Sequence, residues 1–330
     1  MRAALACLAA LLATAAACTA EPVAPRTPPA TTPPATDRST PSIASASDPV
    51  PTPGPSDAPA PAPRFDEDRA IRTVQELAVG VGPRLATGRR FLAAGALLGP
   101  RLVSYGYNPR RQVFAVPGGD SWGVPVHPGR SFNLVATPPD YDPVRPYAIL
   151  GAHLDTIAVS PGAEDNASGV AVLMELARVL RADSALPIVL VLFGGEEPRG
   201  PGDLHHFGSQ YYVASMTAQE RRHLVAMVSL DRVGVGRTVP LYAIDGGPTD
   251  LRDQLERAGE QAGVPTVVGT NTGSDHESFA DAGLPAARVG GTSYAAYHSA
   301  DDVPGVVDRT QLARVGRLLL TWATGRTPGR

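Results

Sequence analysis

The stretch from Gly151 to Gly169, GAHLDTIAVSPGAEDNASG, constrains this chain more than any other part of its sequence. His153 and Asp155 come directly after an apolar run, which indicates that a buried strand ends there. Asp165 then supplies a second carboxylate just before a segment with helical spacing. Imidazole and carboxylate groups suit zinc, and a catalytic zinc takes about three protein ligands and a water. The rest of the chain is therefore expected to provide the missing ligands and a base.

The N-terminus has the pattern of an export signal. Met1 and Arg2 precede an apolar run that ends in small residues, so residues 1–18 are predicted to be a secretory signal peptide. The alanines just before Cys18 resemble a bacterial lipoprotein box, although Ala15 stands where Leu is usual. Ordinary cleavage at an Ala-x-Ala site is the alternative. We expect an exported protein, either a cell-envelope lipoprotein lipidated at Cys18 or a secreted one, with membrane contact only through that anchor.

Composition separates a linker from a folded domain. Residues 19–64 consist mainly of Pro, Ala, Thr and Ser, which bury too little apolar surface to offset the entropy of ordering, so a disordered linker is expected. Residues 65–330 are long enough for a large core without disulfides, and the chain's two cysteines, Cys7 and Cys18, lie outside them. The net charge of −3 offers no basic face for nucleic acid, which excludes that class of partner.

Apolar periodicity within the folded domain predicts alternating helices and strands. Helical spacing is found over Glu67–Leu77, Arg89–Leu98, Ala167–Arg181, Asp250–Ala262 and Thr310–Thr324. Strands are expected over Arg111–Val116, Ser131–Thr137, Tyr147–Ala152, Ile188–Phe193, Leu224–Leu230, Val239–Ile244, Thr266–Val268 and Ala286–Val289. Short apolar runs that alternate with helices indicate an α/β sheet buried on both faces. The first two strands look like an antiparallel pair, so the sheet is expected to be mixed.

Acids and a histidine follow several of these strands. Glu196 and Glu197 come after Ile188–Phe193, Asp231 follows Leu224–Leu230, and a Gly-rich loop leads from the last strand to His298. In open α/β sheets, ligands bind beyond the carboxyl ends of the strands. We therefore expect all of these side chains on one rim.

Together these residues resemble the M28 family of zinc aminopeptidases from about Phe65 to Thr324. The resemblance is carried by His153-x-Asp155, Asp165-Asn166-x-Ser168-Gly169, Glu196-Glu197, Asp231 and Tyr297-His298. It implies a three-layer α/β/α sandwich with a mixed, mostly parallel sheet, and two zinc ions. It also implies a zinc-dependent exopeptidase that removes N-terminal amino acids from peptides or proteins through an activated water.

The resemblance also implies a role for each residue. Asp165 would bridge the two ions, with His153 and Asp231 completing one site and Glu197 and His298 the other. Glu196 would act as the base that moves protons between water and the leaving amine. In addition, Tyr297 would stabilise the developing oxyanion, Asp155 would hold the His153 ring, and Asp275 would lie just behind the ligands.

Each of these residues also has a purely structural interpretation. Asp165 could cap a helix, Glu196 and Glu197 could be solvated charges, and Tyr297 could simply pack. The remaining histidines match no ligand position and are interpreted as structural: His127, His205, His206 and His223.

The segment Pro198–Phe207 departs from the family pattern because it is longer than the link common in aminopeptidases. Glutaminyl cyclases, relatives with one zinc, also have a longer segment here, so cyclisation of N-terminal Gln is the alternative function. Asn166, Ser168 and Gly169 favour the peptidase, because cyclases usually lack that context. A non-catalytic ectodomain would show eroded ligands, and every ligand position is filled.

Overall fold

The computed structural model describes residues 64–180, 184–202 and 204–325, all of which fall in one compact unit. The expected signal peptide with Cys18, and the expected linker up to residue 63, lie outside the described residues. None of the helices in the described ranges is both long enough and apolar enough to cross a lipid bilayer.

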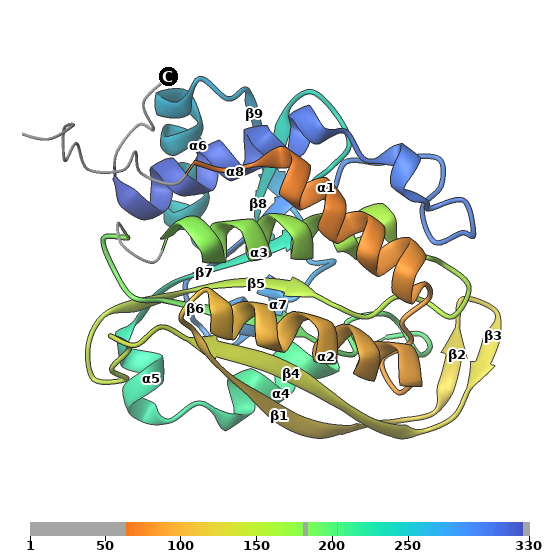
Figure 1. Cartoon of the computed structure of the whole chain (residues 1–330). Coiled ribbons are helices and arrows are strands. Elements are labelled where there is room, and N and C mark those ends of the chain that lie inside the picture. The colour runs from red at the N-terminus through yellow and green to blue at the C-terminus, as the bar shows by residue number, and fades with distance from the viewer. Residues whose placement is uncertain (1–63, 181–183, 203, 326–330) are drawn as a thin grey trace, which may run out of the picture. The chain divides into compact units, whose positions relative to one another are not determined.

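A mixed sheet forms the centre of the fold (Figure 1). The order of its described strands is β1 (Asn108–Val116), β4 (Gly129–Thr137), β6 (Ile188–Phe193), β5 (Tyr147–His153), β7 (Leu224–Asp231), β10 (Ala286–Gly290), β8 (Val239–Ala243) and β9 (Thr266–Thr270). Strands β6, β5, β7 and β10 run parallel, as do β8 and β9, whereas β1–β4, β4–β6 and β10–β8 are antiparallel. The expected mixed, mostly parallel sheet is confirmed.

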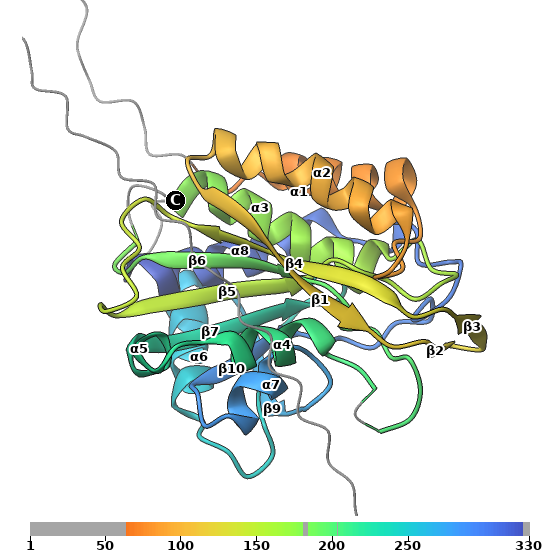
Figure 2. The ribbon, with the colours of Figure 1, turned by 90° about the horizontal axis from the view of Figure 1, so that it is seen from below.

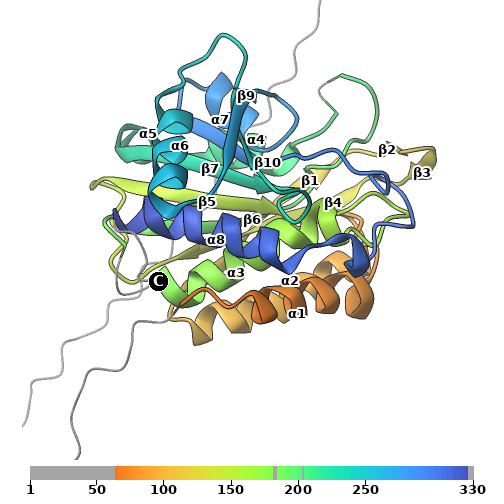
Figure 3. The ribbon, with the colours of Figure 1, turned by 90° about the horizontal axis from the view of Figure 1, so that it is seen from above.

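Alternating side chains of the central strands enter two different cores. In β5, Tyr147 and Ile149 join one apolar cluster, whereas Ala148 and Leu150 join the other. The first of these clusters packs against α4 (Phe207–Ser215) and α7 (His276–Asp281), and Tyr147 donates a hydrogen bond to the carbonyl of Glu220 in α5 (Ala218–His223). The other packs against α1 (Glu67–Gln75), α2 (Arg89–Ser104), α3 (Gly169–Val179), α6 (Asp250–Ala262) and α8 (Arg309–Thr324). The result is the expected α/β/α sandwich (Figures 2 and 3).

Some elements differ from the sequence prediction. Helix α2 continues past Pro100 to Ser104 because Leu98 and Leu102 are both buried, and their packing outweighs the hydrogen bond that proline removes. The short helices α4, α5 and α7 were not predicted. The hairpin of β2 (Gly119–Ser121) and β3 (Val124–Val126) was also missed, since strands of three residues leave little periodicity.

The carboxyl ends of β5, β6, β7 and β10 lie at one end of the sheet. The β2–β3 hairpin reaches the same end as the arrowheads of β5 and β7 (Figures 1 and 2). Every predicted site residue up to Asp231 is therefore brought to one rim by the topology of the strands.

Arg84 ties the N-terminal helices to the chain beyond β5. Its side chain is completely buried and donates hydrogen bonds to backbone carbonyls on both sides. The acceptors are Leu77 and Gly82, in and beside the π-helical turn η1 (Glu76–Val81), and Leu154, Pro161 and Gly162 in the loop after β5. Five carbonyl acceptors satisfy a cation that would otherwise be costly to bury.

Candidate metal centre

The structure brings together the five side chains expected to bind metal. His153 Nε2 lies 3.2 Å from Asp165 Oδ1 and 3.6 Å from Asp231 Oδ1. His298 Nε2 lies 3.2 Å from Asp165 Oδ2 and 3.0 Å from Glu197 Oε2. All five are buried. Asp165 therefore stands between two groups of ligands and presents one oxygen to each.

The donor atoms fit divalent metal ions. The sets His153, Asp165, Asp231 and Asp165, Glu197, His298 each have their ligand atoms within 4.8 Å of one another. His153 Nε2, Asp231 Oδ1 and Glu197 Oε1 are buried without a hydrogen-bond partner in the described part of the chain. Buried polar atoms are normally paired, and two imidazoles with three carboxylates are a donor set that zinc accepts. The residues thus fit the metal that the sequence motifs implied.

Backbone geometry directs Asp165 into the site. It belongs to η2 (Ala163–Ser168), where Asp165 and Asn166 have non-helical dihedral angles, and α3 begins only at Gly169. Asp302 accepts hydrogen bonds from the backbone N–H groups of Glu164 and Asp165, at 2.8 and 3.0 Å. Asp165 is therefore not a helix cap, and its carboxylate is left for the two histidines. Asp302 has no motif that would have distinguished it in the sequence.

Asp155 contacts the His153 ring through its backbone rather than its side chain. Its backbone carbonyl, not its carboxylate, lies 3.1 Å from His153 Nδ1 and orients the ring. The carboxylate instead accepts hydrogen bonds from the backbone N–H groups of Glu196 and Glu197, at 3.1 and 3.3 Å. The expected contact of Asp155 with the imidazole is thus made by the backbone carbonyl, and the carboxylate turns toward the neighbouring strand. Asp155 thereby fixes the backbone that carries both glutamates.

Glu196 has a partner that the sequence did not reveal. Its Oε1 lies 3.3 Å from His206 Nε2, while Oε2 lies 3.9 Å from His153 Nε2. His206 Nδ1 in turn lies 3.1 Å from Glu277 Oε2. The ring of His206, interpreted from the sequence as structural, contacts Glu196, the residue expected to act as the base. The available signal was the position of His206 in the segment that departs from the family pattern.

Tyr297 and His298 form an aromatic cluster with Trp122. Their rings stack with centroids 3.8 Å apart, and Trp122 of the β2–β3 hairpin meets the His298 ring edge-on at 4.3 Å. The guanidinium of Arg232 lies 4.5 Å from the Tyr297 ring centroid. Trp122 is 55% exposed, an unusual position for a large aromatic residue, and sequence analysis did not single it out.

Two arginines flank Asp231. Arg288, which is buried, places Nη2 3.1 Å from Asp231 Oδ2, and Arg232 Nε lies 3.6 Å from Asp231 Oδ1. Burial alone would raise the pKa of Asp231, but these cations and His153 hold it well below its usual range. Among the described residues, Glu197 pairs with His298 and with no arginine. The two ligand groups therefore have different electrostatic surroundings.

The remaining acids show the crowding of negative charge at this rim. Burial, with the nearby Asp165, raises the pKa of Glu197 to about 8. Burial would also raise the pKa of Asp165, but hydrogen bonding to His153 and His298 lowers it to about 2. Asp275, at the start of α7, has its pKa raised to about 7 by burial and then by the charge of Glu196. Within the part of the chain that the structure describes, no hydrogen bond joins the Asp275 carboxylate to a candidate ligand.

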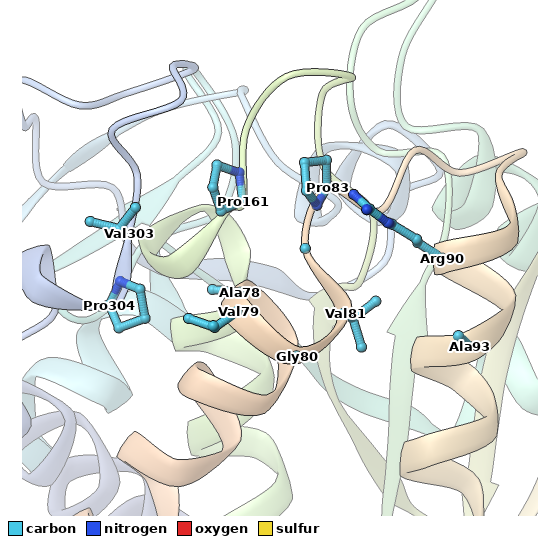
Figure 4. A pocket seen from close by; sticks show the side chains of 11 residues that line it. Ala78, Val79, Gly80, Val81, Pro83, Arg90, Ala93, Pro161, Val303 and Pro304 are labelled. Atoms are coloured by element: carbon cyan, nitrogen blue, oxygen red, sulfur yellow. The ribbon is translucent and has the colours of Figure 1, made fainter.

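The candidate ligands open into a small cavity of about 200 Å³. Asp165, Glu196, Glu197, Pro198, His205, His206, Asp231, Arg232, Gly273, Tyr297 and His298 line it. A larger hollow of about 620 Å³ lies elsewhere, between η1, Arg90 and the loops carrying Pro161 and Pro304 (Figure 4). Of the described residues that line it, only Arg90 is charged, so this hollow lacks the groups for catalysis.

Comparison with known proteins places the chain in a family. Residues 133–323 match the model of Peptidase family M28, and the chain belongs to this family. Aminopeptidase YwaD of Bacillus subtilis (strain 168) is 31% identical over 180 residues, 51% of this chain and 38% of that protein. Leupeptin-inactivating enzyme 1 of Streptomyces exfoliatus is 29% identical over 205 residues, 56% and 45% of the two chains. The match spans less than half of the length of these relatives.

Solved structures with the same fold include a zinc aminopeptidase from Bacillus subtilis, with a TM-score of 0.69 at 18% identity over 78% of this chain and 94% of that one. Porphyromonas gingivalis glutaminyl cyclase gives a TM-score of 0.66 at 25% identity over 78% of this chain and 98% of that one. The M28 fold is thus shared by proteins named for two different reactions. This chain is related to bacterial zinc aminopeptidases at the level of the family.

Proposed function

We propose that this protein is a zinc-dependent aminopeptidase that uses two zinc ions to remove N-terminal residues from peptides. The carrying observation is that Asp165 turns one carboxylate oxygen to His153 and the other to His298. A carboxylate with one oxygen toward each ligand group suits a bridge between two ions, with His153 and Asp231 on one side and Glu197 and His298 on the other. When bound, the zinc ions polarise the scissile carbonyl and lower the pKa of a water.

The residues of the chain perform the remaining chemistry in this proposal. Glu196 accepts a proton from the attacking water and delivers it to the nitrogen of the leaving group, so that water and a peptide bond become a carboxylic acid and an amine. Tyr297, which lines the cavity, donates a hydrogen bond to the developing oxyanion. A cavity of about 200 Å³ is smaller than most ligand sites and suits one terminal residue better than a length of peptide.

Glutaminyl cyclisation is the second candidate, because the segment Pro198–Phe207 is longer than the link common in aminopeptidases. In that reaction the substrate's own α-amine attacks the side-chain amide and releases ammonia. No attacking water is needed, and one ion that polarises the amide would suffice.

Peptide profiling with metal analysis separates the two functions. The purified protein is incubated with a panel of peptides that differ in their N-terminal residue, including Gln, and released amino acids and ammonia are measured. We expect free amino acids and two zinc ions per chain, with His153→Ala losing one ion and most of the activity. One zinc per chain, with ammonia released from Gln peptides and no free amino acid, would assign the cyclase reaction instead.

A further inference from the structure

The longer segment Pro198–Phe207 starts and ends beside the proposed base. The N–H of His206 donates to the carbonyl of Glu196 at 2.9 Å, and the N–H of Phe207 donates to that of Gly195 at 2.8 Å. Within the segment, the N–H of Arg199 donates to the carbonyl of Leu204 at 2.7 Å. The chain thus leaves the site after Glu197 and returns to it at His206.

His206 is held in a conformation that directs its ring into the site. Its φ of 54° lies in the left-handed region, which is uncommon for non-glycine residues although Asn, Asp and His adopt it more often than others. The ring is buried, with Nε2 3.3 Å from Glu196 Oε1 and Nδ1 3.1 Å from Glu277 Oε2. Because both nitrogens face carboxylate oxygens, both have to donate, and the ring is an imidazolium between two acids. Burial would lower the pKa of His206, but Glu196 and Glu277 raise it to about 10.

The two oxygens of Glu196 are therefore not equivalent. Oε1 is engaged by His206, whereas Oε2 points toward the ligand group and lies 3.9 Å from His153 Nε2. A glutamate has three rotatable side-chain bonds, and its useful orientation has to be fixed by contacts around it.

We propose that His206 is a positioning residue, which holds Glu196 by Oε1 so that Oε2 moves the proton, and that Glu277 orients the His206 ring. This inference rests on the proposed role of Glu196. In the proton step, Oε2 gains the proton that the attacking water loses and gives it to the leaving amine, while His206 keeps both of its own protons. Glu277, with its side chain 25% exposed, partly balances the charge of the imidazolium.

The test uses a substitution that suits the backbone but shortens the side chain. Asn tolerates the left-handed region, so His206→Asn preserves the turn while its amide falls short of Glu196. We expect kcat on the preferred peptide to fall about 10- to 100-fold, as for other residues that orient a group in the active site, with KM and zinc content near wild type. His223→Asn, at the end of α5 and directly before β7, at the opposite end of that strand from Asp231, is the control.

A double variant separates positioning from a general structural effect. If His206 acts through Glu196, adding His206→Asn to Glu196→Gln causes no further loss of the residual activity. Losses that multiply in the double variant, or a wild-type kcat in His206→Asn, would overturn the proposal.

A spectroscopic measurement tests the contact without turnover. In zinc-loaded protein labelled with 15N-histidine, we expect the His206 ring nitrogens to shift in Glu196→Gln and in Glu277→Gln. Glu260→Gln, on an exposed face of α6, should leave them unchanged. If the wild-type protein has no aminopeptidase activity, the proposed function is wrong, but these spectra still show whether His206 contacts Glu196 and Glu277. His206 ring signals that stay unchanged in both Glu196→Gln and Glu277→Gln would overturn the proposal that His206 positions Glu196.

Discussion

Glu196 and Glu197 are adjacent in the chain but face different partners. Glu196 contacts His206 through Oε1, whereas Glu197 lies 3.0 Å from His298 and belongs to the second ligand group. The carboxylate of Asp155 accepts hydrogen bonds from the backbone N–H groups of both glutamates. These bonds fix the direction in which each glutamate side chain leaves the backbone.

Substituting the two glutamates should therefore have different effects, one on kcat and the other on zinc content. We expect Glu196→Gln to lose about 100-fold or more in kcat while zinc content stays near wild type, since it removes a proton acceptor and no ligand. Glu197→Ala should lose zinc. Activity assays paired with metal analysis of dialysed protein check both, and an active Glu196→Gln variant would contradict the assignment of the base.

Arg288 and Arg232 predict unequal affinity at the two ligand groups. Asp231 is already paired with two arginines at 3.1 and 3.6 Å, whereas no arginine in the described ranges pairs with Glu197. A zinc ion beside Asp231 meets a carboxylate whose charge is largely balanced, so the group Asp165, Glu197 and His298 should fill first.

Zinc titration against a competing chelator measures this difference. We expect zinc to bind in two steps of different affinity. Arg288→Met should raise the affinity of the weaker step about tenfold, since it removes one nearby positive charge. Arg232→Met gives a second, less buried test, and Arg317→Met on the exposed face of α8 is the control. Equal steps in the wild type, or a weaker step unaffected by either substitution, would contradict the argument.

At the scale of elements, the β2–β3 hairpin brings Trp122 against two residues that line the cavity, Tyr297 and His298. Trp122 meets His298 at 4.3 Å and Tyr297 at 6.3 Å, and a neighbouring hydrogen bond from the N–H of Ala158 to Ser121 Oγ ties the hairpin to the loop after β5. If the proposed aminopeptidase function holds, this exposed indole should contact the terminal side chain of the bound peptide.

We expect Trp122→Asn to raise KM about threefold to tenfold with little change in kcat, because one aromatic contact contributes about 1 kcal/mol. Asn suits the positive φ of 54° at this position. Tyr211→Asn, which removes an exposed aromatic residue from α4, is the control. A change in kcat alone would place Trp122 outside substrate binding.

Much of the fold could be predicted because buried strands and amphipathic helices leave periodic patterns. Strand β6 was predicted with its bounds, and the rim followed from where the acids stand relative to the strands. Contacts that depend on loop geometry could not be predicted in this way. His206, Arg288 and Trp122 reach the site from a long loop, from the parallel strand beside β7 and from a hairpin. The spacing of these residues in the sequence does not indicate those contacts. The same holds for Asp155. The sequence suggested that it contacts His153, but not that the backbone carbonyl rather than the carboxylate makes the contact.

At the scale of the whole molecule, the site concentrates negative charge inside the fold. Asp165, Glu197 and Asp231 are all buried within a few ångströms of one another, and Asp165 repels both of its neighbours. Zinc binds only the folded arrangement, so its binding energy adds to the stability of the native state.

Removing zinc should therefore lower the melting temperature. Zinc at about 1,000 times its Kd stabilises by about 4 kcal/mol, which for a domain of this size corresponds to roughly 8–16 °C. Calorimetry before and after chelation measures the shift, and added zinc should restore it. An unchanged melting temperature in protein shown to have lost its metal would mean that the buried acids are balanced by other means.

Arg84 limits how far the domain can be shortened from its N-terminal side. The family match begins at residue 133, yet Arg84 supplies the donors for the carbonyls of Pro161 and Gly162, immediately before the turn that presents Asp165. Removing residues 64–132 would leave those carbonyls buried without partners, strip strand β1 from β4 and uncover the core beneath α1 and α2. The smallest fragment expected to fold with this centre intact is therefore larger than residues 133–323, the region that matches the family. A fusion or graft meant to carry this centre into another protein has to begin ahead of Phe65.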